Sequence, residues 1–216
     1  MIYTVTLNPA LDKTVQIPSF RLGEVNRISA MRTDPGGKGI NVSKVLRELG
    51  EPSVAAAILG GAAGQKIESA LRALGIEGMY LFTGHETRTN LKIVDPTLHT
   101  NTDVNEPGAP ADEAVLSKLL TQLTDRLRPG DLVVLSGKAP AGAPDTLYRD
   151  WILACRAAGA AVYLDAEGEL LRQGVTAGPA LIKPNQAELS GVMGRPLTAE
   201  DETIRAAQEL LKSLEG

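Results

Sequence analysis

Short apolar, β-prone runs alternate along the chain with longer segments of helical periodicity, and this alternation limits the fold more than any other feature. The expected strands are continuous apolar runs, which is typical of strands covered on both faces. The sequence therefore predicts an α/β fold: a doubly wound, mostly parallel sheet with helices on both faces. The expected strands lie at 2–7, 53–59, 132–137, 161–167 and 180–185, and the expected helices at 40–50, 64–75, 112–127, 144–159, 186–194 and 199–216.

Two stretches break this rhythm, at about 12–33 and 87–106, because polar and apolar residues alternate in them without a convincing helix. Alternation at a period of two is typical of a strand with one covered face and one wet face. We therefore expect both stretches to form one small antiparallel sheet that projects from the α/β body like a lid. Body and lid are expected to form a single domain over residues 1–216.

Composition limits the class of protein. The chain has 216 residues, a net charge of −4 and 3% aromatic residues, so neither a basic patch nor a base-stacking platform points to nucleic acid. No apolar run reaches the ~18 residues that a membrane span needs, and the N-terminus has no signal-peptide pattern. The single cysteine, Cys155, excludes an internal disulfide and is predicted to be a buried, inert thiol. A cytoplasmic location is expected.

A glycine-rich loop precedes the first predicted helix, in the stretch DPGGKGINVSKVLRELG (34–50). Its spacing fits neither the phosphate-binding G-x-x-x-x-G-K-[ST] loop nor the dinucleotide fingerprint G-x-G-x-x-G. From its spacing alone, the loop is equally consistent with a plain turn and with a ligand-binding loop. Nearby, Asp12 lies beyond the carboxyl end of the first strand, where ligands of α/β sheets bind, and Asn41 lies early in the helix. A carboxylate and an amide at such a place suit the hydroxyls of a sugar.

The motifs TLNPALD, GGKGINVSKVLRELG, ETRTNLKI, LSGKAPAG and LIKPNQAEL follow one another along the whole chain. In this order they resemble the landmarks of the PfkB-type sugar kinases, which have the ribokinase-like fold. Within that family the chain is most similar to the kinases of sugar phosphates, 1-phosphofructokinase and tagatose-6-phosphate kinase. The segment TRTNLKI followed by TDVNEPG resembles the fructose-1-phosphate branch more. The resemblance implies a β-sheet lid over the sugar, in agreement with the two alternating stretches.

The resemblance also implies roles for single residues on the sugar side. Asp12 and Asn41 would bind sugar hydroxyls, and Gly36 and Gly37 would let the backbone approach the ring. The substrate already carries a phosphate, which needs cations and charge-assisted hydrogen bonds. The residues expected to bind it are Lys38, Arg27, Arg88 and Ser136, although a solvated lid residue remains an open alternative for Arg27.

On the nucleotide side the resemblance rests on KPNQAEL. Asn185 and Glu188 are three residues apart, so their side chains share one face of a first helical turn. In the family this pair organises water around Mg²⁺, an ion that prefers oxygen ligands and keeps its hydration. Lys183 would meet the phosphates of ATP. The expected cofactors are therefore ATP and Mg²⁺.

The sequence departs from the family pattern at several points. Pro35 stands where a small residue is usual, and Lys138 replaces the second serine of S-G-S-x-P, with a phosphate-binding and a solvent-facing role both left open. The family's G-A-G-D segment, which supplies the aspartate general base, is absent from the 216 residues and is expected further downstream. No other carboxylate, Asp165 included, is promoted in its place. The last predicted helix, with Gly216 as its C-cap, is followed by no strand.

These observations leave more than one function open. The first hypothesis is ATP-dependent phosphorylation of fructose 1-phosphate to fructose 1,6-bisphosphate by the complete protein, with this chain catalytically inactive by itself. The alternatives are a tagatose-6-phosphate kinase and a non-catalytic sugar-phosphate-binding fragment. A nucleotide-cofactor oxidoreductase is disfavoured by the failed dinucleotide spacing. A homodimer through the lid is a further expectation, with neither nucleic acid nor membrane as a partner.

Overall fold

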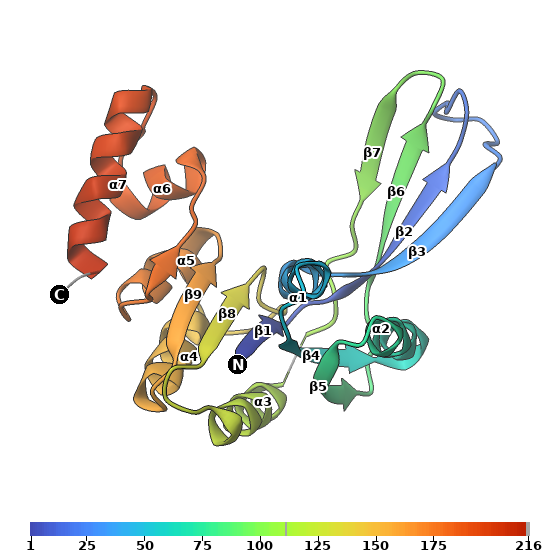
Figure 1. The fold of residues 1–216 in the computed structure, drawn as a ribbon. Coiled ribbons are helices and arrows are strands. Elements are labelled where there is room, and N and C mark those ends of the chain that lie inside the picture. Colours follow the sequence, from blue (N-terminus) through green and yellow to red (C-terminus); the bar gives the residue numbers. More distant parts are fainter. Residues whose placement is uncertain (111, 215–216) are drawn as a thin grey trace.

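The computed structural model describes residues 1–110 and 112–214. Its body is a six-stranded sheet in the order β10-β9-β8-β1-β4-β5, in which all neighbouring pairs are parallel (Figure 1). The predicted α/β fold with a parallel sheet is thus confirmed. The strands are β1 (Ile2–Thr6), β4 (Ser53–Gly60), β5 (Glu77–Thr83), β8 (Leu132–Ser136), β9 (Ala161–Asp165) and β10 (Leu181–Ile182).

The helices that were predicted are all present, because apolar residues recur along them at helical spacing. Two elements were missed, β5 and the helix α5 (Gly168–Val175). The helix α5 has only eight residues and begins directly after the predicted strand 161–167, and β5 is an edge strand with mixed burial. The predicted C-cap Gly216 lies outside the described residues. The remaining helices are α1 (Lys38–Glu48), α2 (Gly61–Ala73), α3 (Glu113–Arg126), α4 (Leu147–Ala157), α6 (Gln186–Met193) and α7 (Glu200–Leu214).

The two alternating stretches form a second sheet that extends away from the body (Figure 1). Its strands, in spatial order, are β3 (Ala30–Gly36), β2 (Ala10–Gln16), β6 (Thr89–Asp95) and β7 (Thr100–Val104). The pairs β2–β3 and β6–β7 are antiparallel, but the central pair β2–β6 is parallel. The prediction of an antiparallel sheet was therefore wrong for this pair. The reason is that β2 follows β1 and β6 follows β5, so both leave parallel body strands in the same direction.

The strand β4 shows how the body is covered on both faces. All eight of its residues are buried. Val54, Ala56 and Ile58 belong to the main core, whereas Ala55 and Ala57 point the other way, into a second cluster with residues of α1 and α2. Because side chains alternate between the faces of a strand, continuous burial needs a helical layer on each side.

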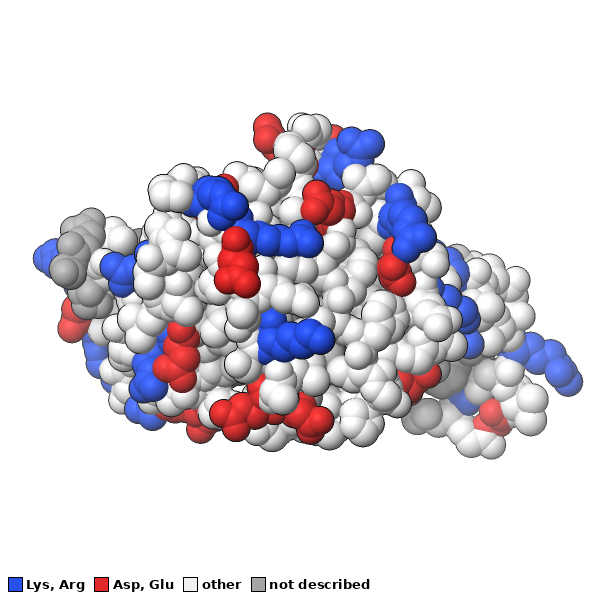
Figure 2. Space-filling model, turned by 90° about the horizontal axis from the view of Figure 1, so that it is seen from below, with Lys and Arg blue, Asp and Glu red and all other residues white. Residues whose placement is uncertain are grey.

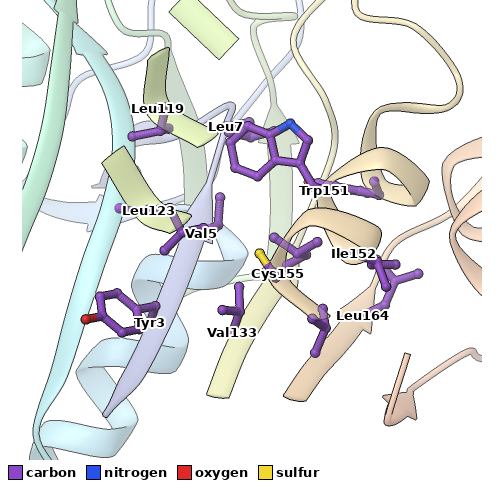
Figure 3. Close-up of a cluster of buried hydrophobic side chains, with 14 of the residues drawn as sticks. Tyr3, Val5, Leu7, Leu119, Leu123, Val133, Trp151, Ile152, Cys155 and Leu164 are labelled. Atoms are coloured by element: carbon purple, nitrogen blue, oxygen red, sulfur yellow. The ribbon is translucent and has the colours of Figure 1, made fainter. Parts of the chain in front are cut away.

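The main core lies between the sheet and the helices α3, α4 and α5. Figure 3 shows part of it, where the side chains of Trp151, Ile152 and Cys155 from α4 meet those of the strands β1, β8 and β9. Burial raises the pKa of the Cys155 thiol to about 12. A thiol that stays protonated at neutral pH is a poor nucleophile, which agrees with the predicted inert role.

Charged side chains of both signs are mixed on the surface. Figure 2 shows acidic and basic groups next to one another on the face seen from below. Several of them form exposed ion pairs, for example Arg126 with Glu77 at 3.4 Å, and such pairs contribute little to stability. Within the described part of the chain, no helix is both long and apolar enough to cross a bilayer.

Candidate functional site

The glycine loop connects the end of β3 to the start of α1, at the place where the second sheet meets the body. Gly37 has a φ of +117°, and a Cβ there would lie 2.5 Å from Thr6 Cγ2. A Cβ on Gly36 would lie 2.1 Å from Asp12 Oδ2. Both positions therefore require glycine, the first for its backbone conformation and for space, the second for space alone. The absent side chain of Gly36 is what lets the Asp12 carboxylate lie against the loop.

A hollow of about 450 Å³, here called the Lys38 hollow, opens beside this loop. It combines three cationic side chains, Lys38, Arg88 and Lys138, with one carboxylate, Glu106. This balance suits an anion such as a phosphate. The full lining is Thr6, Asn8, Gly37, Lys38, Asn41, Arg88, Asn90, Asn105, Glu106, Pro107, Ser136, Gly137 and Lys138.

A neighbouring hollow of about 450 Å³, here called the Asp12 hollow, lies over the second sheet. It contains carboxylates and cations in equal number, so its character is polar rather than cationic. Asn90 and Asn105 line both hollows, which therefore adjoin and together form one cleft. The full lining is Asp12, Thr14, Arg32, Asp34, Lys44, Asn90, Leu91, Lys92, Asp103 and Asn105.

Arg88 connects the two sheets through its guanidinium group. Its Nε donates to the carbonyl of Pro9 (3.3 Å), its Nη1 to that of Glu106 (3.0 Å) and its Nη2 to that of Asn8 (3.1 Å). Burial lowers the pKa of Arg88, and the carboxylates of Asp12 and Glu106 oppose this, so the group stays charged at neutral pH. A guanidinium has five N–H donors. Three donate to backbone carbonyls, and the other two have no hydrogen-bond partner among the described residues.

Two of the predicted phosphate-binding lysines meet at one carboxylate. Asp165, at the end of β9, accepts from Lys38 Nζ through Oδ1 (3.1 Å) and pairs with Lys183 Nζ through Oδ2 (3.5 Å). Its side chain is only 22% exposed. Lys38 comes from the glycine loop and Lys183 from the segment after β10. Asp165 thus brings together Lys38, predicted for the sugar side, and Lys183, predicted for the nucleotide side, at the carboxyl edge of the sheet.

The structure brings most of the predicted sugar-side residues together. Gly37, Lys38, Asn41, Arg88 and Ser136 line the Lys38 hollow. Asp12 lies in the adjoining hollow and Gly36 lies against it. The Ser136 hydroxyl oxygen is buried and has no hydrogen-bond partner among the described residues. Arg27 is apart from the others: it is exposed in the loop between β2 and β3 and lines neither hollow.

Asn185 and Glu188 have a structural role that the sequence prediction did not include. Asn185 Oδ1 accepts from the Glu188 amide (2.9 Å), and Glu188 Oε2 accepts from the Asn185 amide (2.8 Å), a capping box at the start of α6. Among the described residues no group of three or more His, Cys, Asp or Glu could hold a metal ion directly. The pair fits Mg²⁺ only through water, since the cap uses one carboxylate oxygen and leaves the other.

The unpredicted residues that line the cleft include Asn90, Asn105 and Glu106, and a further unpredicted residue, Asp165, pairs with Lys38 of the cleft. The first three occur in the motifs TRTNLKI and TDVNEPG, so the signal was present, but the choice of Arg88 alone missed them. Asp165 carried no such signal, because only the fold shows that it meets two lysines. Lys138 lies at the rim of the Lys38 hollow and pairs with Glu167 at 3.0 Å.

Comparison with known proteins identifies the family of the chain. Residues 5–215 match the model of the pfkB family carbohydrate kinases. A 1-phosphofructokinase of Rhodobacter capsulatus is 38% identical over 213 residues, which are 98% of this chain and 67% of that protein. A tagatose-6-phosphate kinase of Staphylococcus epidermidis is 33% identical over 209 residues, 96% of this chain and 67% of its own length. The chain therefore spans about two thirds of the length of these relatives.

Among solved structures, phosphofructokinase-2 from Escherichia coli in complex with fructose-6-phosphate superimposes with a TM-score of 0.93. It is 32% identical in sequence, and the match covers 98% of this chain and 70% of that one. A family match over nearly the whole chain, relatives above 30% identity and the shared fold all agree. The chain belongs to the pfkB family of carbohydrate kinases.

Proposed function

We propose that the protein serves in ATP-dependent phosphorylation of a sugar phosphate, with fructose 1-phosphate as substrate and fructose 1,6-bisphosphate as product. One observation carries the proposal: a cationic hollow adjoins a hollow with a carboxylate fixed against a glycine loop. The first suits the phosphate and the second suits the hydroxyls of the same ligand. The names of the more similar relatives favour fructose 1-phosphate over tagatose 6-phosphate.

In this proposal the chain's own residues bind and orient the sugar. The free donors of Arg88 and the Lys38 ammonium would hold the phosphate, while Asp12 and Asn41 would bind hydroxyls. Fixed geometry of this kind lowers the barrier by positioning the acceptor hydroxyl. Lys183 would face the phosphates of ATP. ATP supplies the phosphoryl group when bound, and Mg²⁺ neutralises its charge, with Asn185 and Glu188 holding the hydrated ion through water.

The proposal also treats the 216-residue chain as a binding unit without turnover of its own. Glu106 is the one carboxylate of the described residues that lines the Lys38 hollow, and its Oε2 already accepts from the Thr89 amide at 2.8 Å. Asp165 is paired with two lysines. Both carboxylates already have partners, so we assign the general base to neither of them. A general base contributes roughly 10²–10⁴-fold to the rate, so its absence predicts very slow transfer.

Isothermal titration calorimetry separates the candidate functions. The chain is titrated with fructose 1-phosphate, tagatose 6-phosphate and MgATP, and its ability to form ADP is measured with each sugar. We expect the strongest binding with fructose 1-phosphate and no measurable turnover. Tighter binding of tagatose 6-phosphate would move the assignment to that branch. Heat from no sugar phosphate would overturn the function, and rapid ADP formation would overturn the claim of inactivity.

We further propose that body and second sheet form one domain, that the second sheet acts as a lid, and that two copies associate through it in the cytoplasm. Support comes from apolar side chains exposed in this region, Leu22 (89%), Val25 (85%), Ile28 (53%) and Met31 (58%). Exposed apolar patches of this kind are typical of contact surfaces. Light scattering after gel filtration tests the dimer: a monomer at high concentration would contradict it.

A further inference from the structure

Asn90 occupies the boundary between the two hollows of the cleft. It lies on β6, opposite Asp12 of β2 in the parallel register, so the two side chains stand next to each other on the second sheet. Its Nδ2 donates to Asp12 Oδ1 at 3.0 Å. Asn90 lines both the Lys38 hollow and the Asp12 hollow. We propose that Asn90 is a positioning and specificity-determining residue that, together with Asp12, recognises two neighbouring hydroxyls of the sugar.

The orientation of the Asn90 amide follows from its partner. An ionised carboxylate can only accept hydrogen bonds, so the NH₂ group of Asn90 must face Asp12. The amide oxygen, Oδ1, is then the group left over. It is buried, and it has no hydrogen-bond partner among the described residues. Buried acceptors are almost always paired, and an unpaired one in a binding cleft calls for a donor.

The carboxylate of Asp12 is held from two sides. Asn90 donates to Oδ1, and the bare Cα of Gly36 makes room for Oδ2, where a Cβ would lie 2.1 Å away. Removal of the Asn90 amide would leave the carboxylate free to turn towards another donor. The cations that line the same hollow are Arg32, Lys44 and Lys92. Asn90 thus keeps Asp12 directed at a ligand instead of at a neighbouring cation.

Two acceptors on adjacent strands match two donors on adjacent carbons. Neighbouring strands lie roughly 4.8 Å apart, and Asp12 and Asn90 are direct partners in the register of β2 and β6. The Asp12 carboxylate would accept one sugar hydroxyl and the Asn90 carbonyl the next. Because the Asn90 carbonyl oxygen is buried, the surrounding side chains move slightly when it accepts the hydroxyl. The ligand class is a phosphorylated ketose with a free vicinal diol.

This inference rests on the proposed function, and a substrate-by-variant cycle tests it. The chain, Asn90→Ala and the matched control Asn101→Ala are titrated with fructose 1-phosphate and with its 3-deoxy and 4-deoxy analogues. Asn101 is exposed on β7 of the same sheet and lines neither hollow. We expect Asn90→Ala to weaken binding of fructose 1-phosphate about tenfold, and Asn101→Ala to leave it unchanged.

The decisive readout is the coupling between side chain and hydroxyl. One of the two deoxy analogues lacks the hydroxyl that binds the Asn90 carbonyl. For that analogue, Asn90→Ala should reduce affinity by less than about threefold, because the contact is already missing. A merely structural role would weaken all three ligands equally, which would overturn the inference. If Asn90→Ala lowers the melting temperature, Asn90→Ser undergoes the same titrations. Absence of heat with the unaltered chain would overturn the proposed function and this inference together, whereas unchanged binding by the variant would overturn the inference alone.

Discussion

The body and the second sheet differ in how they bury their strands. Every residue of β4 in the body is buried, whereas every residue of β7 in the second sheet is exposed. The main core spans five body strands and three helices. The cluster under the second sheet has only Val15, Ile17 and Ile93 as fully buried members. Packing energy is therefore concentrated in the body, and the second sheet depends on polar contacts for its position.

This difference separates the residues that stabilise the fold from those expected to bind a ligand. The cleft lies where the two regions meet, and its polar side chains come mainly from the second sheet and the glycine loop. Substitutions in the body should lower the free energy of unfolding. Substitutions at the junction should lower ligand affinity at a smaller cost in stability.

Ile152→Ala tests the body core. Ile152 is fully buried on α4, and its neighbour Leu153 is 51% exposed on the same helix. We expect the first substitution to lower the free energy of unfolding by about 2–5 kcal/mol, because it leaves a cavity. Leu153→Ala should change it by less than about 0.5 kcal/mol. Urea denaturation of both variants measures the contrast, and equal losses would contradict a core centred on this face of α4.

Arg88→Lys tests the junction itself. A lysine has a single ammonium nitrogen and cannot reproduce the three separate nitrogens with which Arg88 reaches the carbonyls of Asn8, Pro9 and Glu106. A partly buried carbonyl left without a partner costs about 1–3 kcal/mol. We expect a loss of that size, together with faster hydrogen exchange in β6 and β7 than in β4. Arg149→Lys, on the exposed surface of α4 beside Asp150, is the matched control. Exchange that increases uniformly through the body would show that the two regions are not separable.

Gly36→Ala should reduce affinity more than stability. The new Cβ would collide with the Asp12 carboxylate and turn it away from the ligand. We expect sugar-phosphate affinity to fall about tenfold, a loss of about 1.4 kcal/mol in binding free energy. Gly84→Ala is the control, because a Cβ there meets nothing within 4 Å. Calorimetry measures the sugar-phosphate affinity of both variants. Similar affinities would show that Asp12 does not bind the ligand.

Lowering the pH should destabilise the contacts of the second sheet before those of the body. Asp95 is buried at the end of β6, and its carboxylate accepts from the amides of Ser19, Phe20, Thr97 and Leu98. Burial alone would raise the pKa of Asp95, but these four hydrogen bonds outweigh it and the pKa is lowered. A lowered folded-state pKa means that the stabilisation is complete above the unfolded value of about 3.9 and is lost as pH falls below it.

The measurement for Asp95 is hydrogen exchange of the loops 17–29 and 96–99 as the pH is lowered through 4. In the unaltered protein the amides of these loops should lose their protection from exchange as the pH falls. In Asp95→Asn they should exchange fast already at neutral pH, and the rate should change little on acidification. Loss of protection in β4 at the same pH would mean that acid acts on the whole fold and not on this contact.

The smallest effect concerns Lys138 and Glu167, which form an exposed pair at 3.0 Å. Such pairs contribute about 0–1 kcal/mol, so Glu167→Gln should hardly change stability. Freed from its partner, Lys138 should strengthen sugar-phosphate binding about two- to threefold, and Lys138→Ala should weaken it by a similar factor. Calorimetry at low and high salt checks this. If neither variant changes affinity, Lys138 only faces solvent.

The sequence alone determined all helices but one, most strands and the glycine loop, because each depends on local periodicity or on a local need for space. It also placed Lys38, Asn41 and Arg88 in one group through motif order. It missed α5, which begins directly after a predicted strand, and β5, whose burial is mixed. It also assigned Asn185 and Glu188 to magnesium without seeing that they cap α6.

Only the tertiary structure decided how the cleft is assembled. Asp12 and Asn90 are 78 positions apart in the chain, yet the parallel pairing of β2 with β6 makes them neighbours. The same holds for Lys38 and Asp165, 127 positions apart. Local pattern shows that a segment is a strand but not which strand pairs with it, since pairing depends on how the chain packs as a whole. The cleft is a product of that packing.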